Sequence, residues 1–196
     1  MNLDKLFEMQ KVLDERIVRE KGLEGRDTLP EKILALQVEL GECANEWRRF
    51  KFWSEDREPK TLVRIDCEVC TGTGIGTNFL KNCPSCKGSG KWKTNPLLEE
   101  YVDCLHFILS IGLEHEFNEM LPLSIESITC VDITRQFTML MRTDWEIYEE
   151  GDGAYYHEGL ELFLGLGEML GFTWDQIESA YYAKNEINHV RQAEGY

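Results

Sequence analysis

Acidic side chains occur in two closely spaced sets, and each set lies in a segment with helical periodicity. Glu39 and Glu42 are three residues apart, and Glu46 follows four residues later. Glu100 and Asp103 repeat the three-residue spacing. Because a helix turns by about 100° per residue, side chains three or four positions apart share one face. Carboxylate oxygens are hard ligands, so the two sets predict a Mg²⁺ or Mn²⁺ site rather than a zinc site.

Apolar stripes border both acidic sets. The first stripe is Leu36, Leu40, Cys43 and Trp47, and the second is Leu97, Cys104, Phe107 and Ile111. Acids beside buried surface are costly unless a cation joins them, and metal ions held there can bridge phosphate oxygens and activate a water. Glu99 points toward the side that carries His106, so Glu100 is the expected ligand. The alternative is that these acids line solvated helix faces, since the chain is rich in acidic residues.

Four cysteines form a second candidate site. Cys67 and Cys70 open the unit C-x-x-C-x-G-x-G, and Cys83 and Cys86 open a second copy of it. Four thiolates complete the tetrahedral shell of one structural zinc ion, and the glycines permit the tight turns that aim the sulfurs inward. Redox cysteines are the alternative, but thioredoxin-like sites use one C-x-x-C in a βαβ context that is absent from this sequence. The repeat resembles the cysteine-rich module of DnaJ-type co-chaperones.

The rest of the chain predicts an all-α fold. Helices are expected over residues 3–20, from the capping motif at Thr28 to about Phe50, and over 96–117, 124–149 and 156–170. A last helix is expected from the Thr173 cap to about Gln192. Residues 55–95 break this pattern with glycines, prolines and a net basic charge. We therefore expect a helical domain of residues 1–54 and 96–196, with residues 55–95 as an inserted zinc-knuckle module.

Composition narrows the partners and the location. The 196-residue chain has a net charge of −15, which disfavours a nucleic-acid polymer as ligand, although the basic insert could contact another partner. Neither a signal peptide nor an apolar stretch of about 20 residues is visible. Seven cysteines without a secretory signal suggest metal binding or buried thiols. We expect a cytoplasmic protein, in a bacterial cell or a phage-infected host.

The acidic helices resemble a known family. Helical E-x-x-E followed by E-x-x-D is similar to the signature of the all-α nucleotide pyrophosphatases, the superfamily of MazG and the dimeric dUTPases. Residues 36–54, which end in Phe-Lys-Phe-Trp-Ser, and the tail 181–196 resemble the dimeric dUTPase branch. The segment with Gln10 and Leu13 resembles that branch's first motif, although Asp14 stands where the family often has asparagine. The resemblance implies a homodimeric bundle that hydrolyses dUTP to dUMP and pyrophosphate with a Mg²⁺-activated water.

The resemblance also implies residue roles. Two or more Mg²⁺ ions would be held by four acids, namely Glu39, Glu42, Glu100 and Asp103. Glu39 would be the base for the attacking water. The uracil and deoxyribose would contact Gln10 and Trp53. Phosphate oxygens would be bound by Lys184, Asn188 and Arg191, with Lys51 as a further contact and Tyr196 closing the site. The spacing of Lys184, Asn188 and Arg191 by four and three independently places them on one helical face, as an anion clamp or as a solvated helix end.

Two other functions are compatible with these patterns. The first is a broader pyrophosphatase acting on dCTP and dUTP, or on several dNTPs as MazG does. The second is a zinc-knuckle adaptor whose helical body has lost catalysis and whose basic insert binds a partner. The complete set of four acids, together with Lys184 and Arg191, argues against the adaptor.

Overall fold

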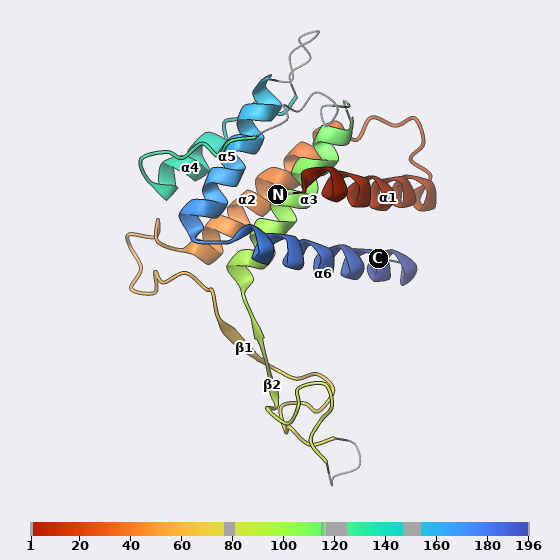
Figure 1. Cartoon of the computed structure of the whole chain (residues 1–196), viewed down its shortest axis with the longest axis vertical. Coiled ribbons are helices and arrows are strands. Elements are labelled where there is room, and N and C mark those ends of the chain that lie inside the picture. Colours follow the sequence, from red (N-terminus) through yellow and green to blue (C-terminus); the bar gives the residue numbers. More distant parts are fainter. Residues whose placement is uncertain (1, 77–80, 115, 117–124, 147–153, 196) are drawn as a thin grey trace. The chain divides into compact units, whose positions relative to one another are not determined.

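A computed structural model of the chain describes residues 2–76, 81–114, 116, 125–146 and 154–195. The backbone divides into two compact units, one formed by Met1–Asn45 with Leu98–Tyr196 and the other by Glu46–Leu97. The sequence predicted an all-α fold, and the structure confirms it: the described residues form six helices and one small two-stranded sheet. Figure 1 labels these elements along the chain.

The helices of the first unit begin and end where the local sequence stabilises their termini. They are α1 (Leu3–Lys21), α2 (Leu29–Trp47), α3 (Pro96–Glu114), α4 (Ile133–Leu140), α5 (Ala154–Leu170) and α6 (Trp174–Ala193), with the last residues of α2 and the first of α3 in the other unit. Gly22 ends α1 in the left-handed conformation. Thr173 and Gln176 form the capping box that the sequence predicted for α6.

Aromatic side chains tie the core helices of this unit together. Tyr101 of α3 stacks on Phe163 of α5 at a centroid distance of 4.3 Å, and its hydroxyl donates to the Phe163 carbonyl. The hydroxyl of Tyr156 on α5 donates to the carbonyl of Ile108 on α3 at 3.0 Å. Tyr181 of α6 donates to the carbonyl of Leu6 on α1. All three tyrosines are buried, so each apolar ring is accommodated only because its hydroxyl finds a partner.

The predicted apolar stripes of α2 and α3 are mostly buried. Leu36, Leu40 and Cys43 are fully buried on α2, as are Cys104 and Ile111 on α3. Their burial fixes the rotation of both helices about their own axes. Glu39, Glu100 and Asp103 are therefore half-buried at the edge of the core, whereas Glu42 is exposed.

The fourth helix is much shorter than the predicted range 124–149. Residues 125–132 are not helical, and α4 begins only after Asp132, whose side chain accepts from the Arg135 N–H. The buried Gln136 side chain explains the irregular segment, because it accepts from the Cys130 N–H and donates to the Ile128 and Leu162 carbonyls. These hydrogen bonds pair polar backbone groups of the loop, so the segment does not need helical hydrogen bonds. The predicted end of this helix at residue 149 and the predicted third-helix end at Phe117 lie outside the described residues.

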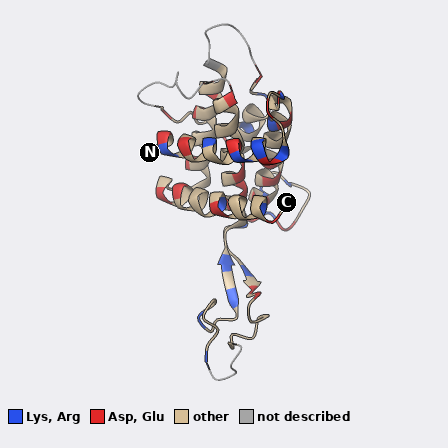
Figure 2. Ribbon diagram, turned by 90° about the vertical axis from the view of Figure 1, so that its right-hand side faces the viewer, with Lys and Arg blue, Asp and Glu red and all other residues tan. Residues whose placement is uncertain are grey.

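The second unit is built on a β-hairpin. Strand β1 (Val63–Asp66) pairs antiparallel with β2 (Lys91–Thr94), and Arg64 faces Lys93 across the ladder. The hairpin carries the cysteine repeats between its strands. Figure 2 shows the basic residues along both strands. The helix α2 ends at Trp47 rather than near Phe50, because Arg48 adopts a positive φ of 62°.

Candidate functional site

Three of the predicted metal ligands converge in the helical unit. Glu39 of α2 and Glu100 and Asp103 of α3 each present a carboxylate oxygen, and these oxygens lie within 4.8 Å of one another. The fourth predicted acid, Glu42, is exposed one turn along α2. Glu99 is exposed and outside the cluster, as the predicted rotation of α3 requires. The two acidic sets, about 60 positions apart in sequence, therefore face each other across the α2–α3 packing.

The environment of these carboxyls opposes their ionisation. Burial raises the pKa of Glu39 to about 7, and the negative charges of Asp103 and Glu42 add to the shift. Burial likewise raises the pKa of Glu100 to about 7, with Asp103 and Glu42 contributing. Burial also raises the pKa of Asp103, although Lys184 acts in the opposite direction. A cluster of this kind favours the binding of a multivalent cation.

One ammonium group lies against the cluster. Lys184 of α6 donates from Nζ to Oδ2 of Asp103 at 2.5 Å, and both side chains are largely shielded from solvent. Arg191, two turns further along α6, also lowers the pKa of Asp103 through its charge. The predicted basic face of the last helix is therefore directed toward the acids.

A cavity of about 580 Å³ opens beside this cluster. Residues of α1, α2, α3 and α6 line it, and six of them were predicted site residues: Gln10, Glu39, Asp103, Lys184, Asn188 and Arg191. The volume is in the range of small-molecule sites. Acidic and basic side chains thus line the same cavity. Such a lining suits a phosphate ester that carries a bound metal ion.

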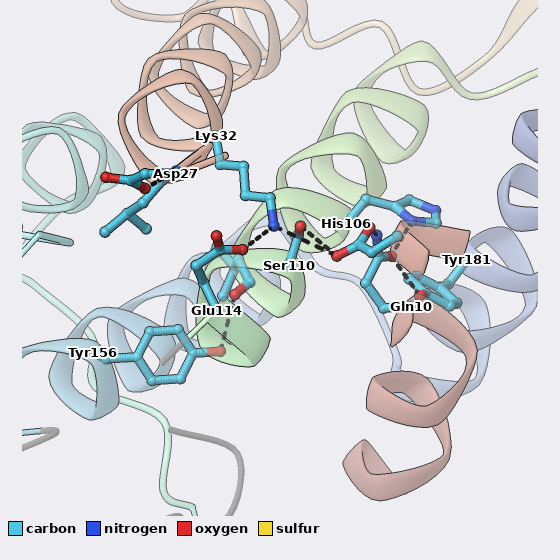
Figure 3. A network of polar contacts seen from close by, with 11 residues as sticks. Gln10, Asp27, Lys32, His106, Ser110, Glu114, Tyr156 and Tyr181 are labelled. Atoms are coloured by element: carbon cyan, nitrogen blue, oxygen red, sulfur yellow. Dashed lines mark hydrogen bonds and ion pairs between the residues drawn. The ribbon is translucent and has the colours of Figure 1, made fainter. Parts of the chain in front are cut away.

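Gln10 is at the centre of a hydrogen-bond network in the same cavity (Figure 3). Its Oε1 is 2.7 Å from Nδ1 of His106 and accepts from the Tyr181 hydroxyl at 2.9 Å. Its Nε2 donates to Oδ1 of Asp14 at 2.8 Å. The hydroxyl of Ser110 donates to Oδ2 of the same aspartate at 2.6 Å. The Gln10 amide is therefore held at both ends.

Two further predicted site residues belong to the second compact unit, namely Trp53 and Lys51. Trp53 is 65% exposed and makes edge contacts with Phe50 and Phe52, while Nζ of Lys51 lies 5.6 Å from the Phe50 ring centre. Tyr196 lies outside the described residues.

Several residues without a predicted site role also line the cavity, and four of them form polar contacts there. These are Asp14, Lys32, His106 and Ser110. His106 is 5% exposed, and its ring stacks on Tyr181 at a centroid distance of 4.2 Å. The sequence did hold a sign of its place in the site. His106 follows Asp103 by three residues, and that spacing puts both side chains on one side of α3.

The four repeat cysteines converge in the second unit. Their sulfurs lie within 4.8 Å of one another, with Cys67 and Cys83 4.0 Å apart and Cys70 and Cys86 3.7 Å apart. Among the described residues all seven cysteines are free thiols. A compact group of four sulfurs fits a closed tetrahedral zinc shell.

The two cysteine repeats bond reciprocally. The N–H of Cys67 donates to the Gly90 carbonyl and the N–H of Cys83 donates to the Gly74 carbonyl, both at 2.8 Å. Within each repeat, the N–H of the last glycine donates to the second sulfur at 3.2 Å. A Cβ at Gly74 would clash with the Gly88 carbonyl oxygen, and Gly74 has a φ of +74°. The glycines of the motif are therefore needed for the two halves to approach each other.

The comparisons place these features in a family. A family model described as dUTPase matches residues 2–72 and 87–196, which together make up most of the chain. The match enters the insert from both sides and leaves out residues 73–86, so the matched region is wider than the predicted helical domain. No curated protein sequence matches the chain significantly. In the part of the chain that the structure describes, no helix combines the length and apolarity needed to cross a bilayer.

Proposed function

Since the chain belongs to the dUTPase family and hydrolyses dUTP, we propose that Mg²⁺ bound by Glu39, Glu42, Glu100 and Asp103 supports this reaction and that dUMP and pyrophosphate are its products. The observation that carries the proposal is the convergence of three carboxylates within 4.8 Å beside a cavity of nucleotide size.

The donor set of the cluster fits a hard divalent cation. All candidate ligand atoms are carboxylate oxygens, which Mg²⁺ and Mn²⁺ prefer over zinc. The raised pKa values of Glu39 and Glu100 reflect burial first and then the neighbouring negative charges, which Lys184 only partly offsets. When bound, the metal supplies positive charge that lowers the pKa of water and offsets the charge of the phosphates.

The protein side chains then divide the remaining tasks. Glu39 lines the cavity and accepts the proton of the water that attacks the α-phosphorus. Lys184, Asn188 and Arg191 bind phosphate oxygens from one face of α6, which orients pyrophosphate as the leaving group. Gln10 contacts the base.

Other assignments rest on the sequence resemblance. We propose that Trp53 packs on the uracil and deoxyribose, that Lys51 contacts a phosphate and that Tyr196 closes the site. We also propose that the enzyme is a cytoplasmic homodimer. Exposed apolar side chains on the helical unit, such as Leu34, Val38 and Val190, support a dimer interface.

The second metal site has a separate role in this proposal. One zinc ion bound by Cys67, Cys70, Cys83 and Cys86 orders the insert and takes no part in hydrolysis. Four thiolates leave no open coordination position for water or substrate, which supports a structural role.

Hydrolysis of dUTP in H₂¹⁸O with Mg²⁺ tests the proposed reaction. Attack at the α-phosphorus places the label in dUMP and releases unlabelled pyrophosphate. Formation of dUDP and orthophosphate, or label in pyrophosphate, contradicts the mechanism. Equal turnover of all four dNTPs would instead indicate a MazG-like enzyme, and no turnover of any nucleotide would indicate an adaptor.

A further inference from the structure

The hairpin that carries the cysteine module differs in charge from the rest of the chain. Residues 61–94 contain five basic and two acidic side chains, whereas the whole chain has 21 basic and 36 acidic ones. All five basic side chains are exposed, namely Arg64, Lys81, Lys87, Lys91 and Lys93. The net charge of −15 is thus compatible with a separate basic region on the second unit, which includes both strands (Figure 2).

One face of the two-stranded ribbon holds a cationic pair that does not favour its stability. Arg64 of β1 is directly opposite Lys93 of β2 in the antiparallel register. Side chains paired in this way are about 5 Å apart at Cβ, and like charges at that distance destabilise a hairpin. Among the described residues neither side chain forms an ion pair. Lys91 on the same face contacts only the exposed Asp66, at 3.5 Å, and water screens that contact. Three cations are therefore available to an anionic ligand.

The other face of the ribbon carries an aromatic side chain. Because side chains alternate along a strand, Trp92 lies on the face opposite to Lys91 and Lys93, beside its register partner Ile65. Its side chain is held by a hydrogen bond to Cys67: burial opposes ionisation of that thiol, but hydrogen bonds, including the one from Trp92, lower its pKa. Trp92 nevertheless remains 44% exposed. An indole ring that is held in place and partly open to solvent is suited to stacking on a planar group.

This combination fits single-stranded nucleic acid better than an acidic protein or a duplex. A protein partner needs an apolar centre in its interface, and the basic face offers only charged side chains there. A duplex keeps its bases stacked inside and has none to offer to Trp92. The ribbon is only two strands wide, so a flexible single strand can follow its edge with phosphates on the basic face and a base on the ring.

We propose that the β1–β2 ribbon binds single-stranded nucleic acid, with Arg64, Lys91 and Lys93 contacting phosphates and Trp92 stacking on a base. None of these residues lines the cavity that contains the acidic cluster. The proposal is therefore independent of the proposed hydrolytic chemistry. Bound in this way, the enzyme would hydrolyse dUTP beside a polynucleotide.

Fluorescence anisotropy of a labelled oligothymidylate, titrated with the full chain, tests the proposal. Three phosphate contacts predict that the logarithm of the affinity falls against the logarithm of the salt concentration with a slope of about −2, since each contact to a single strand contributes about −0.7. A duplex of equal length should bind at least about fivefold more weakly. Absence of binding, equal binding of the duplex, or displacement of the oligonucleotide by polyaspartate at equal charge would overturn the proposal.

The variant Arg64→Glu separates binding from stability. It places an acid opposite Lys93, so the hairpin should be at least as stable as before, and residues 55–95 should remain resistant to protease. The affinity for oligothymidylate should nevertheless fall by about tenfold or more, with a shallower salt slope. Arg57→Glu makes the same charge change at an exposed position outside the ribbon and should bind within about twofold of the unaltered chain. Unchanged binding by Arg64→Glu would overturn the proposal.

Two substitutions of Trp92 test the stacking contact. Trp92→Leu should lower the affinity by about fivefold or more and leave the salt slope unchanged, because it removes a base contact and no phosphate contact. Trp92→Phe keeps an aromatic ring and should retain most of the affinity. Lys93→Gln provides a milder test of the basic face and should reduce the magnitude of the salt slope by about 0.7. Equal affinities for the leucine and phenylalanine variants, or an unchanged slope in Lys93→Gln, would refute the assigned contacts.

Discussion

The ammonium group of Lys184, which we propose binds phosphate, lies 2.5 Å from the carboxylate of Asp103, which we propose binds metal. The pair joins α6 to α3 inside the cavity that contains the other candidate residues. In the absence of substrate, Lys184 is the main partner of Asp103. On substrate binding, the same ammonium can exchange this contact for a phosphate oxygen.

Replacing Lys184 by methionine should therefore impair dUTP hydrolysis. We expect kcat/KM to fall by at least about tenfold, because a charge-assisted phosphate contact is lost from the site. Lys21→Met, at the exposed end of α1, is a matched control that should have no effect. Steady-state kinetics at fixed Mg²⁺ distinguish the two variants, and normal kinetics in Lys184→Met would remove this residue from the proposed clamp.

Amide substitutions test the acids as a unit. Replacing Glu39, Glu42, Glu100 or Asp103 by its amide should lower kcat by at least ~10²-fold, because each change removes charge from a shared metal site. Glu99→Gln should be nearly neutral, since Glu99 is exposed and outside the cluster. Activity assays over a Mg²⁺ series provide the comparison. A strong effect at Glu99 with none at Glu100 would contradict the site.

The raised carboxyl pKa values predict a pH dependence of stability in Mg²⁺-free protein. Glu39 and Glu100 each have a folded-state pKa of about 7, above the usual 4.5, so the folded protein binds their protons more tightly than the unfolded chain. Their stabilising effect is fully present below pH 4.5 and is lost as the pH rises to about 7. The thermal midpoint should fall across this window. Excess Mg²⁺ or the double variant Glu39→Gln/Glu100→Gln should reduce the fall, and an identical slope in all three samples would refute this account.

Dimerisation can be tested on α2. Leu34 and Val38 are 61% and 50% exposed and lie one turn apart on the same face. If this face forms an interface, Leu34→Glu with Val38→Glu should yield a monomer by light scattering, since two charges would be buried without partners. A fully active monomer of the unaltered chain at assay concentration would contradict the proposed homodimer.

Removal of zinc should unfold the insert but not the enzyme. Cys67→Ser with Cys86→Ser should abolish stoichiometric zinc and make residues 55–95 sensitive to protease, because metal binding supplies the folding energy of so small a module. Hydrolysis of dUTP should persist within about tenfold. Cys130→Ser, outside the cluster, should retain the zinc. Collapse of hydrolysis in a folded helical body would assign the insert to the active site.

The sequence allowed the acidic cluster to be predicted because local periodicity determines which face of a helix a residue occupies. Glu100 rather than Glu99 follows from that rule alone. The network of Gln10 and His106 did not follow, since it joins residues 96 positions apart, and no local pattern encodes that contact. The prediction of a long fourth helix was wrong for the same reason. The side chain of Gln136 bonds to the Leu162 carbonyl of α5, a contact distant in sequence, and so supports an irregular segment before α4.

The antiparallel pairing of β1 and β2 also has a consequence for how this protein can be rebuilt. Val63 and Thr94 are directly opposite each other, so the chain enters and leaves the cysteine module at neighbouring points. Residues 64–93 therefore form a cassette whose excision needs only a tight turn to reconnect the backbone. The same two positions can accept a foreign domain with adjacent termini, which makes the hairpin a natural acceptor site for reporter or affinity modules.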